Sequence, residues 1–234
     1  MKKALVIALM ASFTVAFAVT PFPGPKGHKV FLKASKSPYL LENSVVLPAT
    51  DSLIIEAGVE VFMSGYAKLL LRGSVQILGT SQKPVAFRNA DSSDSWNGVH
   101  FATGSQYFVV RNLVIENAFR NTVTQSSGIF ENVHFVNNYY GLWVENAPKV
   151  ELVGCSFRRN RFALSVGTGS VHFKKTEIRD NVFGLYLEKG ATFVGDTAPI
   201  HDNLEADVRR ESDEMAGKGR KVSHSVWQRI EAGF

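Results

Sequence analysis

The sequence has little cysteine and proline, and these shortages exclude several classes of protein. Cys155 is the single cysteine among 234 residues, so neither a disulfide framework within the chain nor a multi-cysteine zinc site can form. With 8 prolines and 19 glycines, the chain has neither a collagen-like nor a low-complexity composition. The six histidines include no pair spaced i, i+4, so no metal site is predicted. An apolar fraction of 45% and a charged fraction of 20% are typical of one globular domain.

A long hydrophobic run is also absent outside the first residues of the chain. Lys2 and Lys3 precede an apolar run over residues 4–17, which ends in the small-x-small sequence Ala16-Phe17-Ala18. This run is shorter than the ~20 residues that span a membrane, and its layout is that of a secretory signal. We therefore expect residues 1–18 to be removed. The mature protein should be secreted, periplasmic or at the cell surface, without a membrane span.

The formal net charge is +5, and many of the basic residues lie near the two ends of the chain. Outside the cytoplasm, a basic surface is expected to meet anionic glycans or lipid headgroups rather than nucleic acid. The alternative is that these charges are simply solvated.

Two repeat periods run along the chain, and both have the i, i+2 alternation of strands. The first is 16 residues and relates Leu53, Leu69 and Val85. The second is 21 or 22 residues and is marked by asparagines, namely Asn117, Asn138, Asn160, Asn181 and Asn203. A period near 20 with short strands predicts stacked coils, in which each asparagine amide bonds the next one.

A leucine-rich repeat is the alternative, because it also places Asn after an apolar position. The alternating pattern over residues 140–145 that follows Asn138 disfavours it. Instead, the stretch from about residue 52 to 210 resembles a right-handed parallel β-helix of the pectate-lyase type. Runs such as Leu53-Ile54-Ile55-Glu56-Ala57-Gly58-Val59 and Trp96-Asn97-Gly98-Val99 carry this resemblance. It implies a fold but little about function, since lyases, hydrolases, epimerases, adhesins and inert spacers share it.

The predicted architecture is an all-β, single-stranded right-handed parallel β-helix, a solenoid with a short helical C-terminal segment. Residues 19–45 should form an N-terminal cap, residues 46–210 the β-helix, and residues 211–234 a charged linker with a short helix. That helix either closes the last coil or docks a partner protein through residues 222–234.

Catalytic motifs of the pectate-lyase-like enzymes are not found. The Asn-Thr-Asp stretch of polygalacturonases, for example, would need an acid where Val123 follows Asn121-Thr122. The best acidic candidates are Asp180 and Asp202, which should stack one coil apart at ~4.8 Å. Such a pair could serve a retaining glycosidase, or a calcium ion given more oxygen ligands. The alternative is a charge ladder neutralised by Arg159.

The best binding candidates lie on one outward column, where Trp143 and Tyr186 should flank Ser165. Glu145 and Glu188 follow two residues later on the same face. Exposed rings can stack on a sugar while carboxylates accept from its hydroxyls. The alternative is that a loop or the C-terminal helix covers the rings. A second aromatic column is expected to stack in the core, namely Phe119, Tyr140, Phe162 and Phe183.

Three interpretations follow from these patterns. The favoured one is a noncatalytic, secreted β-helix whose flat outer face binds polysaccharide or another cell-envelope component, without a cofactor. The second is a structural or assembly module that docks by its C-terminal segment. The third is a divergent polysaccharide lyase or glycoside hydrolase.

Overall fold

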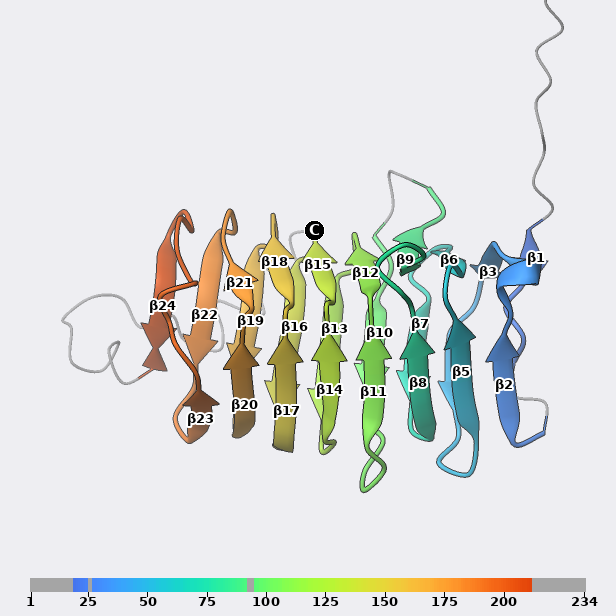
Figure 1. The fold of residues 1–234 in the computed structure, drawn as a ribbon, viewed down its shortest axis with the longest axis horizontal. Coiled ribbons are helices and arrows are strands. Elements are labelled where there is room, and N and C mark those ends of the chain that lie inside the picture. The colour runs from blue at the N-terminus through green and yellow to red at the C-terminus, as the bar shows by residue number, and fades with distance from the viewer. Residues whose placement is uncertain (1–18, 25–26, 92–94, 212–234) are drawn as a thin grey trace, which may run out of the picture.

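The computed structural model describes residues 19–24, 27–91 and 95–211. The chain winds into a rod of stacked coils whose strands lie side by side from one end to the other (Figure 1). The strands form three parallel sheets of eight strands each. A short 3-10 helix, η1 (Ala34–Lys36), lies in the first coil.

Each complete coil contributes one strand to each sheet. The strands of a sheet therefore follow one another at every third position along the chain, except at the first step of sheet A and the last step of sheet C. Sheet A contains β1 (Thr20–Pro21), β3 (Tyr39–Leu41), β6 (Glu60–Met63), β9 (Val85–Asn89), β12 (Leu113–Glu116), β15 (His134–Val136), β18 (Ser156–Arg158) and β21 (Glu177–Ile178). Sheet B contains β2 (Lys29–Leu32), β5 (Ser52–Glu56), β8 (Ser74–Leu78), β11 (Phe108–Arg111), β14 (Gly128–Glu131), β17 (Ala147–Val153), β20 (Gly169–Lys174) and β23 (Ala191–Val194). Sheet C contains β4 (Val45–Leu47), β7 (Lys68–Leu71), β10 (Gly98–Phe101), β13 (Arg120–Thr124), β16 (Tyr140–Glu145), β19 (Phe162–Val166), β22 (Phe183–Leu187) and β24 (Ala206–Arg210).

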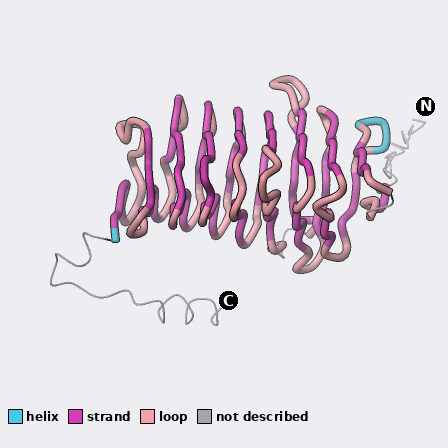
Figure 2. Tube along the Cα trace, turned by 90° about the horizontal axis from the view of Figure 1, so that it is seen from below, coloured by secondary structure: helices cyan, strands magenta, loops and turns pink. Residues whose placement is uncertain are grey.

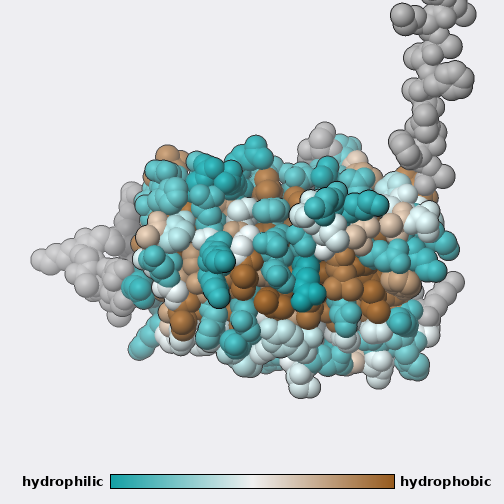
Figure 3. Space-filling model, in the orientation of Figure 1, coloured by the Kyte–Doolittle hydropathy of each residue, from teal (hydrophilic) through white to brown (hydrophobic). Residues whose placement is uncertain are grey.

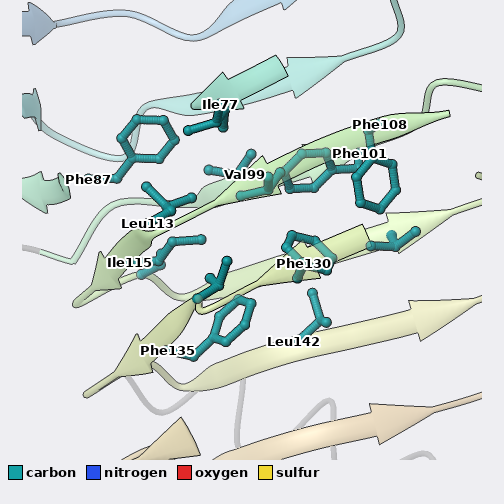
Figure 4. Packing of buried hydrophobic residues seen from close by; sticks show 14 of the residues in the cluster. Ile77, Phe87, Val99, Phe101, Phe108, Leu113, Ile115, Phe130, Phe135 and Leu142 are labelled. Carbon is teal, nitrogen blue, oxygen red and sulfur yellow. The ribbon is translucent and has the colours of Figure 1, made fainter. Parts of the chain in front are cut away.

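Alternation within each strand sends one set of side chains into the rod. In β5, for example, Leu53 and Ile55 are 1% and 0% exposed, while the residues between them are half-buried. Equivalent positions stack because the sheets are in register, as with Leu53 opposite Val75. Aromatic rings continue this stack in the interior, where Phe101, Phe108 and Phe130 meet at centroid distances of 4.8–5.3 Å (Figure 4). Each fully buried apolar side chain of this kind contributes about 1.5–3 kcal/mol.

The 16-residue period does not relate successive coils. Leu53, Leu69 and Val85 lie in β5, β7 and β9, which belong to three different sheets. The true partner of Leu53 on the next coil is Val75. The 16-residue period is seen because all strands share the same alternation of apolar residues. Successive strands within one coil therefore look alike in sequence.

The predicted N-terminal cap is wrong, because residues 29–47 already form a complete coil. β2 pairs with β5, β3 with β6 and β4 with β7, all in parallel. Val30 and Leu32 point into the interior and are 4% and 0% exposed. Their strand has four residues only, too few for its alternation to stand out in the sequence.

Four of the five predicted ladder asparagines form the ladder. The amide oxygens of Asn160, Asn181 and Asn203 each accept the backbone N–H of the ladder residue on the preceding coil, at 2.9–3.1 Å. Asn117 does not belong to it. Ala118 takes its place and donates its N–H to Asn138 Oδ1 at 2.9 Å.

Asn117 lies instead in a neighbouring column of turn residues. Its φ is +59°, Asn137 has a φ of +54°, and the Asn117 amide donates to Asn89 Oδ1 at 2.7 Å. Left-handed backbone of this kind favours Asn. The cause is a register shift, since Arg120 pairs with Tyr140 while Thr122 pairs with Trp143.

The outside of the rod is flat along each sheet (Figure 2). Figure 3 shows apolar side chains along the middle of one long face, with polar side chains above and below them. On sheet B the outward column contains Phe31, Ile54, Val109 and Ile129. No helix among the described residues has the length and apolar character to cross a membrane. The predicted signal, 1–18, and nearly all of the predicted C-terminal segment, 212–234, lie outside the described residues.

Candidate functional site

The outer face of sheet C carries the predicted aromatic column. Trp143 of β16 is in register with Ser165 of β19, which is in register with Tyr186 of β22. The column runs over eight coils as Val46, Leu70, His100, Thr122, Trp143, Ser165, Tyr186 and Arg209. Ser165 is 6% exposed and leaves room between the two half-buried rings.

The two predicted glutamates lie along one side of this column. Glu145 is exposed at the end of β16, and Glu188 follows β22 and is half-buried. Gly167 lies between them on the intervening coil, and a Cβ on this glycine would be 3.2 Å from Glu188 Oε2. The glycine therefore leaves the space into which the Glu188 carboxylate reaches.

A further array of rings, which we call the aromatic stack, adjoins Trp143. It consists of Phe119, Tyr139, Tyr140, Phe162 and Phe183. Phe162 lies between Tyr140 and Phe183, with ring centroids 5.0 Å away on each side. The ring of Trp143 is 5.6 Å from that of Tyr140.

The expectation that four of these rings stack in the core is confirmed in part. Tyr140 and Phe162 are buried, each 6% exposed, whereas Phe119 and Phe183 are half-buried. None of the four belongs to the cluster that fills the interior. At the corner before β19, Ala163 and Leu164 both enter that cluster, so strict alternation does not extend back to Phe162. The rings therefore form a separate stack at this corner.

Two arginines lie on the aromatic stack, and sequence reasoning missed both of them. The guanidinium carbon of Arg120 is 5.3 Å from the Trp143 ring centre and 6.0 Å from that of Phe119. That of Arg161 is 5.6 Å from Tyr139 and 5.9 Å from Phe162. Both are at cation–π distance. Their position next to the aromatic column is the signal by which the sequence could have indicated these two arginines.

Several nitrogen donors of this surface have no acceptor. The Nε atoms of Arg120 and Arg161 and the Nε1 atom of Trp143 are buried without a hydrogen-bond partner among the described residues. Neither arginine forms an ion pair within the same part of the chain. Buried donors are usually paired, so these three unpaired donors, each beside apolar rings, are unusual.

His100 lies on the same face, one coil before Thr122. Its Nδ1 is 2.9 Å from Thr122 Oγ1, and its Nε2 is 2.7 Å from Asn97 Oδ1. Burial lowers the pKa of His100 to about 4, and the positive charges of Arg120 and Lys68 contribute to this. The imidazole is therefore neutral at pH 7, with Nε2–H donating to Asn97 and Nδ1 accepting from Thr122.

Asp180 and Asp202 stack on successive coils, as predicted, but at an exposed turn. Asp180 N–H donates to the Asp202 carbonyl oxygen at 3.2 Å, and both residues have left-handed backbone, with φ of +59° and +57°. Their carboxylates pair with different neighbours, Asp180 with Arg179 and Asp202 with His201. Each carboxylate thus has its own partner.

A comparison with known protein families assigns the chain to one of them. The family model for the right-handed β-helix region matches residues 43–205. The chain belongs to the right-handed β-helix family. This agrees with the predicted fold and with the three parallel sheets. No curated protein and no solved structure matches the chain.

Metal ligands and the cysteine thiol are the other candidate reactive groups of this β-helix. Among the residues that the structure describes, no three His, Cys, Asp or Glu side chains are placed to hold a metal ion. Burial raises the pKa of the Cys155 thiol to about 12, which keeps it protonated and unreactive. What the β-helix presents on sheet C is a surface of half-buried rings, two arginines and flanking carboxylates.

Proposed function

We propose that this protein is an exported, noncatalytic β-helix that binds polysaccharide or a related cell-envelope component on the outer face of sheet C. The observation that carries the proposal is the continuity of Trp143 with the aromatic stack over consecutive coils. Coils repeat at ~4.8 Å, so rings recur at intervals along a flat surface. Such a surface suits an extended chain of sugar rings better than a compact ligand.

The polar groups around the rings support the same ligand class. The Nε1–H of Trp143 is buried without an acceptor among the described residues, so it would donate to a sugar oxygen only if the indole ring turned outward. Glu145 and Glu188 would accept from hydroxyl groups on the other side of the column. A sugar chain supplies apolar ring faces, acceptors and donors together, and this is the combination that the face can use.

A catalytic role has less support. Retaining glycosidases need two carboxyl groups that act together on one bond, whereas Asp180 and Asp202 each pair with a neighbouring basic side chain. Both also lie at the corner between sheets A and C, within the last coils of the rod. We therefore place the ligand on Trp143 and its neighbours rather than on the aspartates.

The test is a binding titration of residues 19–234 against acidic and neutral polysaccharides, with an absorbance assay for unsaturated uronate. Trp143→Ala should weaken binding about five- to thirtyfold, because a central aromatic contact contributes about 1–2 kcal/mol. Tyr107→Ala is the matched control, since Tyr107 is 48% exposed and lies in the loop before β11 of sheet B. It should bind like the wild type.

Three other results would overturn the proposal. If Trp143→Ala and Tyr107→Ala lost the same binding affinity, sheet C would not be the binding face. Uronate product would make the protein a lyase. Absence of both binding and product would favour the docking module, and residues 222–234 would then be the segment to delete.

A further inference from the structure

Lys68 and Arg120 place two positive charges on the outer face of sheet C, one on each side of β10. Both are in register with Gly98, which lies between them on β10. Gly98 adds no side chain to this column, and the carbonyl oxygen of Arg120 fills the position that a Cβ on Gly98 would take. His100 is the next outward residue of β10, and the positive charges of Arg120 and Lys68 both act on it. Three nitrogen-bearing side chains from adjacent coils therefore lie near one another on this face.

Acidic side chains are missing around these two cations in the described part of the chain. The strands β7, β10 and β13 contain neither Asp nor Glu. Arg72, directly after β7, adds a further positive charge, and Glu145 lies opposite Thr124 on the next coil. Lys68 and Arg120 make no ion pair within the described residues. The buried, unpaired Nε of Arg120 is an unused donor of the same cluster.

We infer that Lys68, His100 and Arg120 form a binding site for an oxyanion group, a carboxylate or a sulfate, and that His100 takes up a proton when the site is filled. The inference deepens the proposed function and rests on it, because it assigns a negative charge to the ligand and places that charge at one end of the aromatic surface. The proton would come from solvent, and no covalent step is involved.

The proton uptake follows from the charges that act on His100. In the free protein, burial and the two cations hold the pKa of His100 at about 4. A bound oxyanion would offset the repulsion from Arg120 and Lys68 and attract the imidazolium, so the pKa rises in the complex. The complex then binds more protons than the free protein below pH 7. Affinity must therefore increase as the pH falls from 7 toward 4, by at most about tenfold per pH unit for one proton.

The first experiment follows the His100 ring signals by NMR during pH titration of residues 19–234. The probes are sodium sulfate, polygalacturonate, dextran sulfate and uncharged dextran, each at matched ionic strength. Sulfate and the two anionic polymers should raise the pKa of His100, and dextran should not. Arg120→Gln should raise it without any ligand, because one of the two repelling charges is removed. An unchanged pKa with every anion would overturn the inference.

The second experiment measures affinity for polygalacturonate and dextran sulfate between pH 7 and 5. The wild type should bind more tightly at the lower pH, whereas His100→Gln should change by less than about twofold. His172→Gln, on the outer face of sheet B, is the control and should behave like the wild type. Full pH dependence in His100→Gln would exclude His100 as the linked group.

The two experiments separate this inference from the proposed function. A pKa shift with sulfate but no binding of any polysaccharide would support the oxyanion site and contradict the glycan proposal. If dextran bound as strongly as the anionic polymers, the glycan proposal would be supported and the oxyanion site would be contradicted. Preference for polygalacturonate over dextran sulfate would identify the group as a carboxylate, and the opposite preference as a sulfate.

Discussion

Asn160 joins three coils of the rod through one side chain. Its Oδ1 accepts from the backbone N–H and the amide of Asn138, at 2.9 and 3.0 Å. Its amide donates to Phe135 O and to Asn181 Oδ1, both at 2.9 Å. Asn160→Ala would leave buried donors and acceptors unpaired, so we expect a loss of about 2–4 kcal/mol in the free energy of unfolding. Urea denaturation of the wild type and the variant measures this loss.

Asn117→Gly is the control for this prediction, because Asn117 occupies the left-handed turn column rather than the ladder. Glycine tolerates its φ of +59°. Two side-chain hydrogen bonds are lost, a half-buried one donated to Asn89 and an exposed one accepted from Asn137. The expected cost is about 1 kcal/mol or less. A cost equal to that of Asn160→Ala would mean that Asn117 stabilises the rod as much as a ladder residue does.

Residue positions in the ladder could be predicted only as far as the register is regular. The spacing from Asn138 to Asn203 alternates between 21 and 22 residues, and the structure stacks all four amides. Between Asn117 and Asn137 the coil is one residue shorter, and a single sequence does not show where that residue is absorbed. The same shift aligns Phe119 with Tyr139 and puts Arg120 beside Trp143, which is why the arginine was missed.

Strand β10 depends on Gly98, whose φ is +134°. A Cβ at this position would lie 1.9 Å from the carbonyl oxygen of Arg120. Gly98→Ala must therefore separate β10 from β13, and we expect a loss of about 3 kcal/mol or more in the free energy of unfolding. Thermal denaturation followed by circular dichroism tests this.

Gly104, in the loop after β10, gives the matched comparison. Its φ is +62°, and no atom lies within 4 Å of a Cβ built on it. Gly104→Ala should therefore cost about 1 kcal/mol, from backbone strain alone. If both variants lost the same stability, backbone conformation rather than the contact between β10 and β13 would explain the effect.

Elements were predictable where apolar alternation is long enough to recognise. The strands β5 and β8 have five residues each, with the buried positions in strict alternation, and the sequence indicates them clearly. The prediction of a cap failed for the first coil because β2, β3 and β4 have only three or four residues each. Short strands of this kind are stabilised by the neighbouring coil rather than by their own pattern.

Over the whole molecule, the strands of each coil pair only with strands of the coils beside it, so stability is close to a sum of neighbouring interfaces. The central strands are well buried, as in β19, where all five residues are buried. The last coil is different. No residue of β23 or β24 is buried, and Val194 and Leu204 are 48% and 79% exposed. Opening should therefore begin at the C-terminal end of the rod.

Hydrogen exchange on the full chain tests this gradient. Amides of β13, β16 and β19 should exchange slowest, and those of β23 and β24 fastest, since local opening free energy follows burial and contact density. The oxyanion site on β7, β10 and β13 would then lie in the stable half of the rod, where its three side chains are held without a ligand. Equal protection in the first and last coils would contradict the gradient. It would show that the rod unfolds as one unit, and that contacts beyond the described residues stabilise β23 and β24.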